Sequence, residues 1–230
     1  MIKAVLFDLD GTLLDRDASL RSFIDGQYER LEKWIGHIPK ERYISRFIEL
    51  DKHGYVWKDK VYQQLIAEHR IRGISQEALL QDYVTKFQNH CIPFPGMHDM
   101  LDELKKRSIP MGIISNGKGQ FQMNNIKALK IDPYFDAILI SQWENMKKPD
   151  VRLFYRALDR LQAAPSESVF IGDHPDNDVK AARSIGMKGL WKKDPQWNAP
   201  DADGVVGNLL EVVDWVDHQP PFEALKNDIL

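Results

Sequence analysis

Short apolar runs, each bounded by acidic, hydroxyl or glycine residues, recur along the chain at wide intervals. Their length and their branched side chains predict buried β-strands. They cover residues 2–7, 110–115, 136–141 and 168–172, with weaker runs at 187–191 and 204–206.

Between these runs, apolar residues recur every three or four positions, which is the spacing of one helix face. Such faces are formed by Met97, Met100, Leu101 and Leu104, by Leu153, Phe154, Ala157, Leu158 and Leu161, and by Val179, Ala182 and Ile185. Alternating strands and helices predict an α/β fold, a Rossmann-like, doubly wound parallel sheet with helices on both faces.

One stretch, residues 17–91, shows four sets of helical spacing and no convincing strand. It predicts an inserted, all-helical cap domain of four helices. Residues 92–96 (IPFPG) then return the chain to the sheet, with prolines that stiffen the return and a glycine that permits a turn. We therefore expect a core domain of residues 1–16 and 92–218, a cap domain of residues 17–91, and a peripheral, proline-marked tail of residues 219–230.

Composition narrows the functional classes. The 230 residues include 31 basic and 34 acidic ones, for a net charge of -3, which argues against a nucleic-acid polymer as partner. Cys91 is the single cysteine, so no internal disulfide forms, as suits a reducing compartment. With no apolar stretch near the roughly 20 residues that cross a bilayer, we expect a cytoplasmic protein without membrane contact, as a monomer or weak homodimer.

In a parallel sheet, ligands bind beyond the carboxyl ends of the strands. The first predicted strand leads into Asp8-Leu9-Asp10-Gly11-Thr12. Two carboxylates one residue apart suit a hard cation, and Asp8 attacking phosphorus would need such a cation to offset charge repulsion. Asp10 could protonate the leaving oxygen and then activate water. An ordinary acidic turn explains this motif alone about equally well.

The next strand ends lead into Ser115-Asn116-Gly117 and Lys147-Lys148-Pro149-Asp150. A hydroxyl, an amide and a glycine N–H can donate to a phosphoryl oxygen, and a lysine can neutralise its charge. Taken singly, a helix N-cap and a surface loop explain these two segments better.

The fourth strand leads into residues 172–178 (GDHPDND). Three acids at one strand end are hard to explain by stability, because like charges repel and are costly to desolvate. Asp173 is placed to complete a metal site with Asp8, and Asp178 suits an outer role. Asp176 is explained by a favourable position near a helix N-terminus.

In this order, the four segments resemble the four motifs of the haloacid dehalogenase superfamily of phosphatases, with a helical insertion similar to a C1-type cap. The resemblance spans about residues 2–206. It implies Asp8 as the nucleophile that forms an aspartyl-phosphate and Asp10 as general acid/base. It also implies that Mg²⁺ binds the carboxylates of Asp8 and Asp173 and the backbone carbonyl of Asp10. The phosphate-binding residues would be Thr12, Ser115, Asn116 and Lys148, with Asn177 and Asp178 supporting the metal from outside.

Within this superfamily, Asp10 separates reaction classes. The dehalogenases lack an acid at that position, so its presence implies transfer of a phosphoryl group, and it argues against a phosphonate hydrolase with a catalytic cap lysine. A sugar-phosphate mutase on the same core stays open, as does a non-catalytic phospho-aspartate signalling or binding protein. We expect a hydrolase of small phosphomonoesters.

The cap is expected to select the substrate. Its most suggestive run is residues 49–57 (ELDKHGYVW), which combines charge, aromatic surface and a glycine turn between two helices. An ordinary solvated loop explains the run about equally well. Candidates to face the substrate are Arg16, Arg21, Arg46, Lys52, His53, Trp57 and Lys58. Sugar phosphates, nucleoside monophosphates and phosphorylated cofactors all remain open as the small phosphorylated metabolite. Pattern alone assigns no role to His174 or Trp197.

Overall fold

The computed structural model describes residues 1–218. These residues form two compact units, one made of Met1–Leu14 and the chain from Pro93 onward, the other of Asp15–Ile92. The tail expected at residues 219–230 lies outside the described residues.

The first unit is built on a six-stranded sheet in which every pair of neighbours is parallel, in the order β3-β2-β1-β4-β5-β6. The strands are β1 (Ala4–Phe7), β2 (Met111–Ser115), β3 (Ala137–Ile140), β4 (Ser168–Gly172), β5 (Lys188–Lys192) and β6 (Gly204–Val206). Each of the six apolar runs forms a strand, so the predicted fold class is confirmed.

Strand β1 lies at the centre of this sheet, between β2 and β4. All four of its residues are buried, as expected of a strand covered on both faces. Phe7 pairs with Ile113 on one side and with Ile171 on the other. The residues that follow these strands therefore emerge at the same edge of the sheet.

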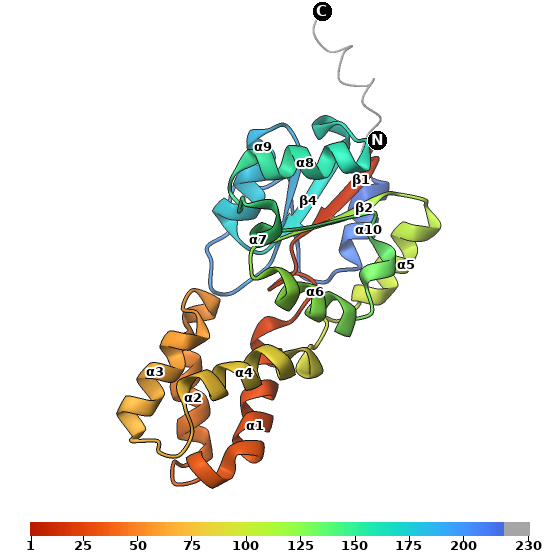
Figure 1. The fold of residues 1–230 in the computed structure, drawn as a ribbon. Helices are drawn as coiled ribbons and strands as arrows, with labels where there is room; N and C mark the ends of the chain where they lie inside the picture. Colours follow the sequence, from red (N-terminus) through yellow and green to blue (C-terminus); the bar gives the residue numbers. More distant parts are fainter. Residues whose placement is uncertain (219–230) are drawn as a thin grey trace, which may run out of the picture. The chain divides into compact units, whose positions relative to one another are not determined.

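Helices cover both faces of the sheet (Figure 1), with α8 and α9 on one face and α5 and α10 on the other. The helices of this unit are α5 (Met97–Lys106), α6 (Gly119–Ala128), α7 (Ser141–Glu144), α8 (Val151–Leu161), α9 (Ala181–Ser184) and α10 (Glu211–Asp217). Single 3₁₀ turns occur at Asp132–Tyr134 and Pro165–Glu167. On α8, the predicted apolar face is buried and packs with Leu6 and Phe170 of the sheet.

The second unit is helical and lies in sequence between β1 and β2, as predicted. It consists of α1 (Arg16–Ile35), α2 (Lys40–Asp51), α3 (Lys58–His69) and α4 (Gln76–Lys86), with 3₁₀ turns at Lys52–Gly54 and Phe87–His90. Phe23, Tyr43, Phe47 and Tyr62 form part of its fully buried core. None of the helices in residues 1–218 has both the length and the apolar character of a membrane-spanning segment.

Candidate active site

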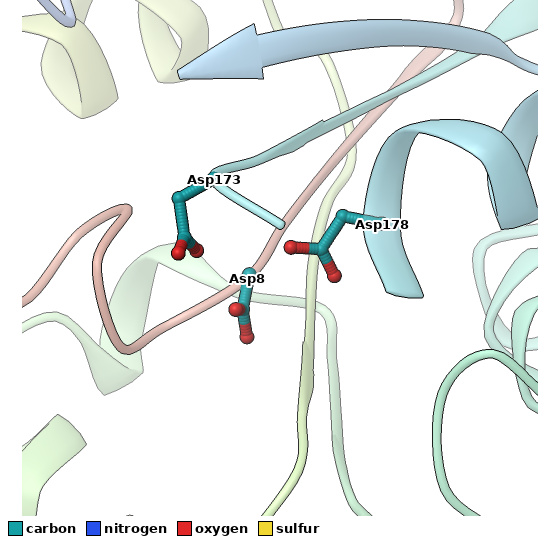
Figure 2. A group of neighbouring side chains, drawn as sticks. All are labelled: Asp8, Asp173 and Asp178. Atoms are coloured by element: carbon teal, nitrogen blue, oxygen red, sulfur yellow. The ribbon is translucent and has the colours of Figure 1, made fainter. Parts of the chain in front are cut away.

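Three carboxylates meet where strands β1 and β4 end. Asp8 follows β1 directly, Asp173 follows β4 directly, and Asp178 lies on a π-helical turn (Pro175–Lys180) that comes after β4. One carboxylate oxygen from each residue lies within 4.8 Å of the other two. Figure 2 shows the three side chains close together at the ends of their strands. The register of the parallel strands thus produces the acidic cluster predicted from the order of the motifs.

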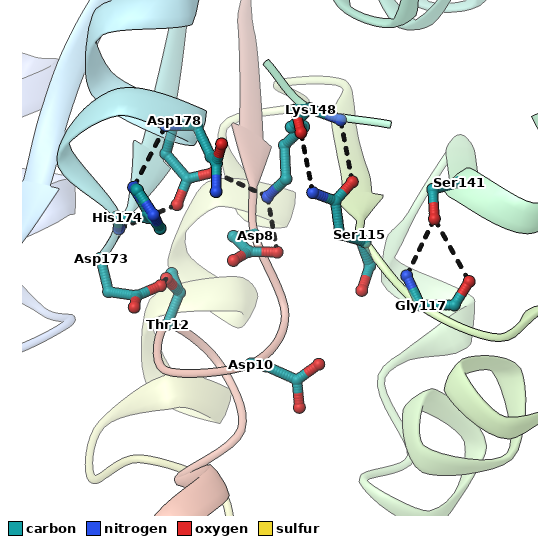
Figure 3. Close-up of polar contacts among 12 residues, drawn as sticks. Asp8, Asp10, Thr12, Ser115, Gly117, Ser141, Lys148, Asp173, His174 and Asp178 are labelled. Atoms are coloured by element: carbon teal, nitrogen blue, oxygen red, sulfur yellow. Dashed lines mark hydrogen bonds and ion pairs between the residues drawn. The ribbon is translucent and has the colours of Figure 1, made fainter. Parts of the chain in front are cut away.

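Lys148 is the cation at the centre of this cluster. Its Nζ lies 2.7 Å from Oδ1 of Asp8 and 2.7 Å from Oδ1 of Asp178 (Figure 3). The lysine is only 3% exposed. Burial opposes its charge, but Asp178 and Asp8 outweigh that effect and raise the pKa of the Lys148 ammonium above its usual value. Lys148 is therefore protonated and bridges two acids.

One ammonium does not balance three carboxylates. Burial raises the pKa of Asp8 to about 6, with Asp178 adding to this effect and Lys148 opposing it. Burial, Asp178 and Asp8 likewise raise the pKa of Asp173 well above its usual range. Closely spaced, partly buried oxygen ligands with excess negative charge are what a hard divalent cation requires. The side chains present at this site therefore fit Mg²⁺.

The loop after β1 is shaped around Asp173. Gly11 adopts φ +83°, and a Cβ atom placed there would lie 2.7 Å from the Asp173 carboxylate. Glycine thus permits both the left-handed backbone and the close approach. The hydroxyl of Thr12 donates to Oδ1 of Asp173 at 3.3 Å. Thr12, predicted to bind phosphate, is directed to an acid of the cluster in this structure.

The side chain of Asn116 holds the backbone of Lys148. Its Nδ2 donates to the carbonyl of Lys148 at 3.0 Å, and its Oδ1 accepts from the N–H of Lys148 at 2.8 Å. This pair of hydrogen bonds joins the loop that follows β2 to the segment that follows α7. The amide predicted to contact phosphate therefore orients Lys148, and Lys148 in turn reaches Asp8.

His174 caps the turn that carries Asp178. Its Nδ1 accepts from the backbone N–H groups of Asp176 and Asn177, at 3.1 and 3.2 Å. The N–H of His174 donates to Oδ2 of Asp178 at 3.0 Å. Burial lowers the pKa of the His174 imidazole, which suits a ring nitrogen that accepts. Its ring packs against Trp197, with centroids 4.6 Å apart.

Two residues that contact the site lie outside the four sequence motifs and were not predicted as site residues. Gln122 of α6 donates through Nε2 to Oδ2 of Asp10 at 2.5 Å and to Oγ of Ser115 at 2.8 Å. Trp191, at the end of β5, donates through Nε1 to the carbonyl of Asp173 at 2.7 Å. Helical spacing counted from apolar positions does not reveal Gln122, because it is a polar residue buried by hydrogen bonding.

The cap candidates differ in what they contact within their own unit. Lys58 is 2% exposed and, with Arg16, pairs with the buried Asp51. Arg21 pairs with Glu41, and Arg46 with Glu49 and Glu68. Lys52 and His53 are exposed and adopt left-handed backbone angles. Trp57 is half-buried, with its ring edge-on to Tyr83.

Known proteins support this architecture. The family model of haloacid dehalogenase-like hydrolases matches residues 5–192. A glyceraldehyde 3-phosphate phosphatase from Pyrococcus furiosus is 26% identical, over 95% of this chain and 94% of that protein. A phosphoglycolate phosphatase from Escherichia coli is 28% identical, over 80% of this chain and 79% of that protein. These phosphatases confirm the enzyme class predicted from sequence.

The fold also occurs among solved structures. The magnesium-bound HAD-hydrolase YfnB from Bacillus subtilis matches with a TM-score of 0.74 at 21% identity, over 94% of this chain and 99% of that one. At this identity the likeness concerns the fold. Since the family model covers most of the residues, from the first strand to the fifth, the chain belongs to the haloacid dehalogenase-like hydrolase family.

Proposed function

We propose that this protein is a magnesium-dependent phosphatase that hydrolyses small phosphomonoesters through an aspartyl-phosphate on Asp8. One observation carries the proposal: Lys148 is buried between Asp8 and Asp178, with its Nζ 2.7 Å from an oxygen of each. The Asp8 carboxylate lies beside this buried ammonium and near two further acids. It can attack an anionic phosphoryl group once the negative charge of the carboxylates and the phosphoryl group is compensated.

In the first step, a carboxylate oxygen of Asp8 forms a bond to phosphorus while the bond from phosphorus to the ester oxygen breaks. Asp10, the next acid along the chain, donates its proton to the leaving oxygen, so that a neutral alcohol departs. Ser115 and Lys148 bind the phosphoryl oxygens. Lys148 also keeps the Asp8 carboxylate ionised at neutral pH, against the effect of burial.

In the second step, Asp10 accepts a proton from water, and the water oxygen attacks phosphorus. The bond between phosphorus and Asp8 breaks, which releases orthophosphate and restores both carboxyl groups. The carboxylates of Asp8 and Asp173 and the backbone carbonyl of Asp10 would hold Mg²⁺, which offsets repulsion between nucleophile and phosphoryl group. Asp178 and Asn177 would support this arrangement from outside, Asp178 through Lys148 and Asn177 through the turn capped by His174.

The substrate class rests on the named relatives. Glyceraldehyde 3-phosphate and phosphoglycolate, after which the two phosphatases are named, are both small, anionic phosphomonoesters. We propose that the substrate of this chain is likewise a small phosphorylated metabolite.

The test is turnover of a panel of small phosphomonoesters, with Mg²⁺ and with EDTA, by the native protein and by Asp8→Asn. We expect orthophosphate release by the native protein only with Mg²⁺, and a loss of at least about 10³-fold in Asp8→Asn with an unchanged circular dichroism spectrum. Asp176→Asn is the matched control, because Asp176 lies in the acidic segment after β4, next to the site, and its side chain is 69% exposed. Near-native activity of Asp8→Asn would remove Asp8 from the mechanism.

A further inference from the structure

Gln122 lies against two groups that act in the proposed reaction. It belongs to α6 and is 2% exposed. Its single Nε2 atom donates to Oδ2 of Asp10 at 2.5 Å and to Oγ of Ser115 at 2.8 Å. Asp10 comes from the loop after β1 and Ser115 from the end of β2. One amide therefore links a carboxyl group beyond the end of β1 to a hydroxyl at the end of the neighbouring strand β2.

The chemistry of its neighbours determines how this amide is oriented. A carboxyl oxygen without a proton accepts a hydrogen bond, and the nitrogen of Gln122 faces such an oxygen, Oδ2 of Asp10. The carbonyl oxygen of Gln122 accepts from Nδ2 of Asn125 at 3.1 Å. Asn125 lies three residues further along α6 and is completely buried. The side chain of Gln122 is thus held at both of its polar atoms.

The β2 loop leaves room for this side chain. A Cβ atom at Gly117 would lie 2.8 Å from Cγ of Gln122. The backbone N–H of Gly117 donates to Oγ of Ser141 at 2.9 Å. The absence of a side chain at Gly117 therefore leaves space for Gln122, and the N–H of Gly117 is bonded to the first residue of α7.

We propose that Gln122 is a positioning residue that aligns the carboxyl group of Asp10 with the phosphoryl group held by Ser115. This inference rests on the proposed function. In that reaction Asp10 protonates the leaving oxygen, and Ser115 binds another oxygen on the same phosphorus. Both groups must therefore keep a defined separation. Loss of the amide removes its hydrogen bonds to Asp10 and Ser115, while Asp8 and Lys148 keep their contacts.

A misplaced general acid affects esters unequally. A phenolate leaves readily without protonation, whereas an alkoxide needs a proton as it leaves. Loss of Gln122 should therefore slow hydrolysis of an alkyl phosphate more than that of an aryl phosphate. A side chain that only supports the fold would lower both rates by the same factor.

The experiment compares kcat/KM for p-nitrophenyl phosphate and for glycerol 3-phosphate in the native protein and in Gln122→Met and Gln122→Glu. The ratio of aryl to alkyl kcat/KM cancels the fraction of folded enzyme, so partly unfolded variants remain informative. We expect this ratio to rise about tenfold in both variants. Gln120→Met, an exposed position on the same helix that bonds Asn124, should keep the native ratio.

An unchanged ratio in both Gln122 variants would overturn the inference while leaving the phosphatase reaction in place. Failure of the native protein to hydrolyse either ester is a different result. It would remove the proposed function, and the inference with it.

Discussion

At the scale of single residues, the main feature of the site is a group of charged side chains that are buried from water. Asp8 and Asp173 have raised pKa values because they are buried and lie near other acids, and Lys148 compensates only part of that charge. Breaking a buried ion pair by removing one partner costs about 3 to 5 kcal/mol. Without a bound cation, the uncompensated charge of these buried carboxylates therefore lowers the stability of the fold. Such perturbed pKa values cluster at functional sites.

We predict that protons and Mg²⁺ compete for the acidic cluster. Because the pKa of Asp8 is about 6 in the folded protein, against 3.8 for an ordinary aspartate, the metal-free fold holds a proton that the unfolded chain releases between these values. The stability of the metal-free protein should therefore fall as pH rises from about 4 to about 6. Over the same range protons cease to compete for the carboxylates, so stabilisation by Mg²⁺ should grow.

The measurement is the increase in unfolding temperature that Mg²⁺ produces at pH 7.5 and at pH 5. We expect a shift of several degrees at pH 7.5 and a much smaller one at pH 5, since affinity should weaken up to about tenfold per pH unit below about 6. Asp176→Asn should respond as the native protein does. Equal shifts at the two pH values would contradict the assignment of Asp8 as a ligand.

At the scale of elements, a second buried charge cluster organises the cap. Asp51, at the end of α2, accepts from Arg16 at the start of α1 at 2.7 Å and pairs with Lys58 at the start of α3. It also accepts from the N–H of Gly54 at 2.8 Å. Burial opposes ionisation of Asp51, but Arg16 and Lys58 together hold its pKa below the usual value. One carboxylate thus joins the ends of three helices.

We predict that Asp51→Asn destabilises the cap unit by about 3 kcal/mol at neutral pH, because it removes the buried carboxylate that pairs with both Arg16 and the buried Lys58. Amide hydrogen exchange of α1 and α3 would measure the loss in that unit alone. Glu49→Gln is the control, since Glu49 lies on the same helix, is exposed and pairs only at its surface with Arg46. Native exchange rates in Asp51→Asn would show that the cluster does not hold these helices.

Elements were predicted well where apolar periodicity reports burial and poorly elsewhere. The six strands and the four cap helices follow from such periodicity. Helix α6 was not predicted, because polar residues such as Gln122 and Asn125 lie on its buried side and are stabilised there by hydrogen bonds. The short helix α10 was also not predicted.

At the scale of the whole molecule, the chain crosses between the two units twice, at neighbouring points. Leu14 and Pro93 form an antiparallel bridge, and the N–H of Phe94 donates to the carbonyl of Leu13 at 3.0 Å. The points where the chain leaves and re-enters the sheet unit, Leu14 and Pro93, therefore lie side by side. An insertion with adjacent ends can be removed at little cost in loop entropy.

We predict that a chain in which a short Gly-Ser linker joins Leu14 to Pro93 folds as the sheet unit alone and keeps its response to Mg²⁺. Far-UV circular dichroism and the Mg²⁺-induced shift in unfolding temperature would test this. If the cap selects the substrate, as expected from the sequence, residual turnover should be slower and less selective among phosphomonoesters. An unfolded product would show that the sheet unit depends on the cap.

The sequence by itself determined the fold class, the family and the location of the candidate chemistry. Strand periodicity is a local property of the sequence, and a parallel sheet follows from the general rule for alternating strands and helices. Together they bring Asp8, Ser115 and Asp173 to one edge of the sheet. Only the tertiary structure decided which atoms meet. Asn116 orients Lys148, His174 caps a turn, and Gln122 joins Asp10 to Ser115. These contacts join distant segments through buried polar side chains, whose partners no local pattern specifies.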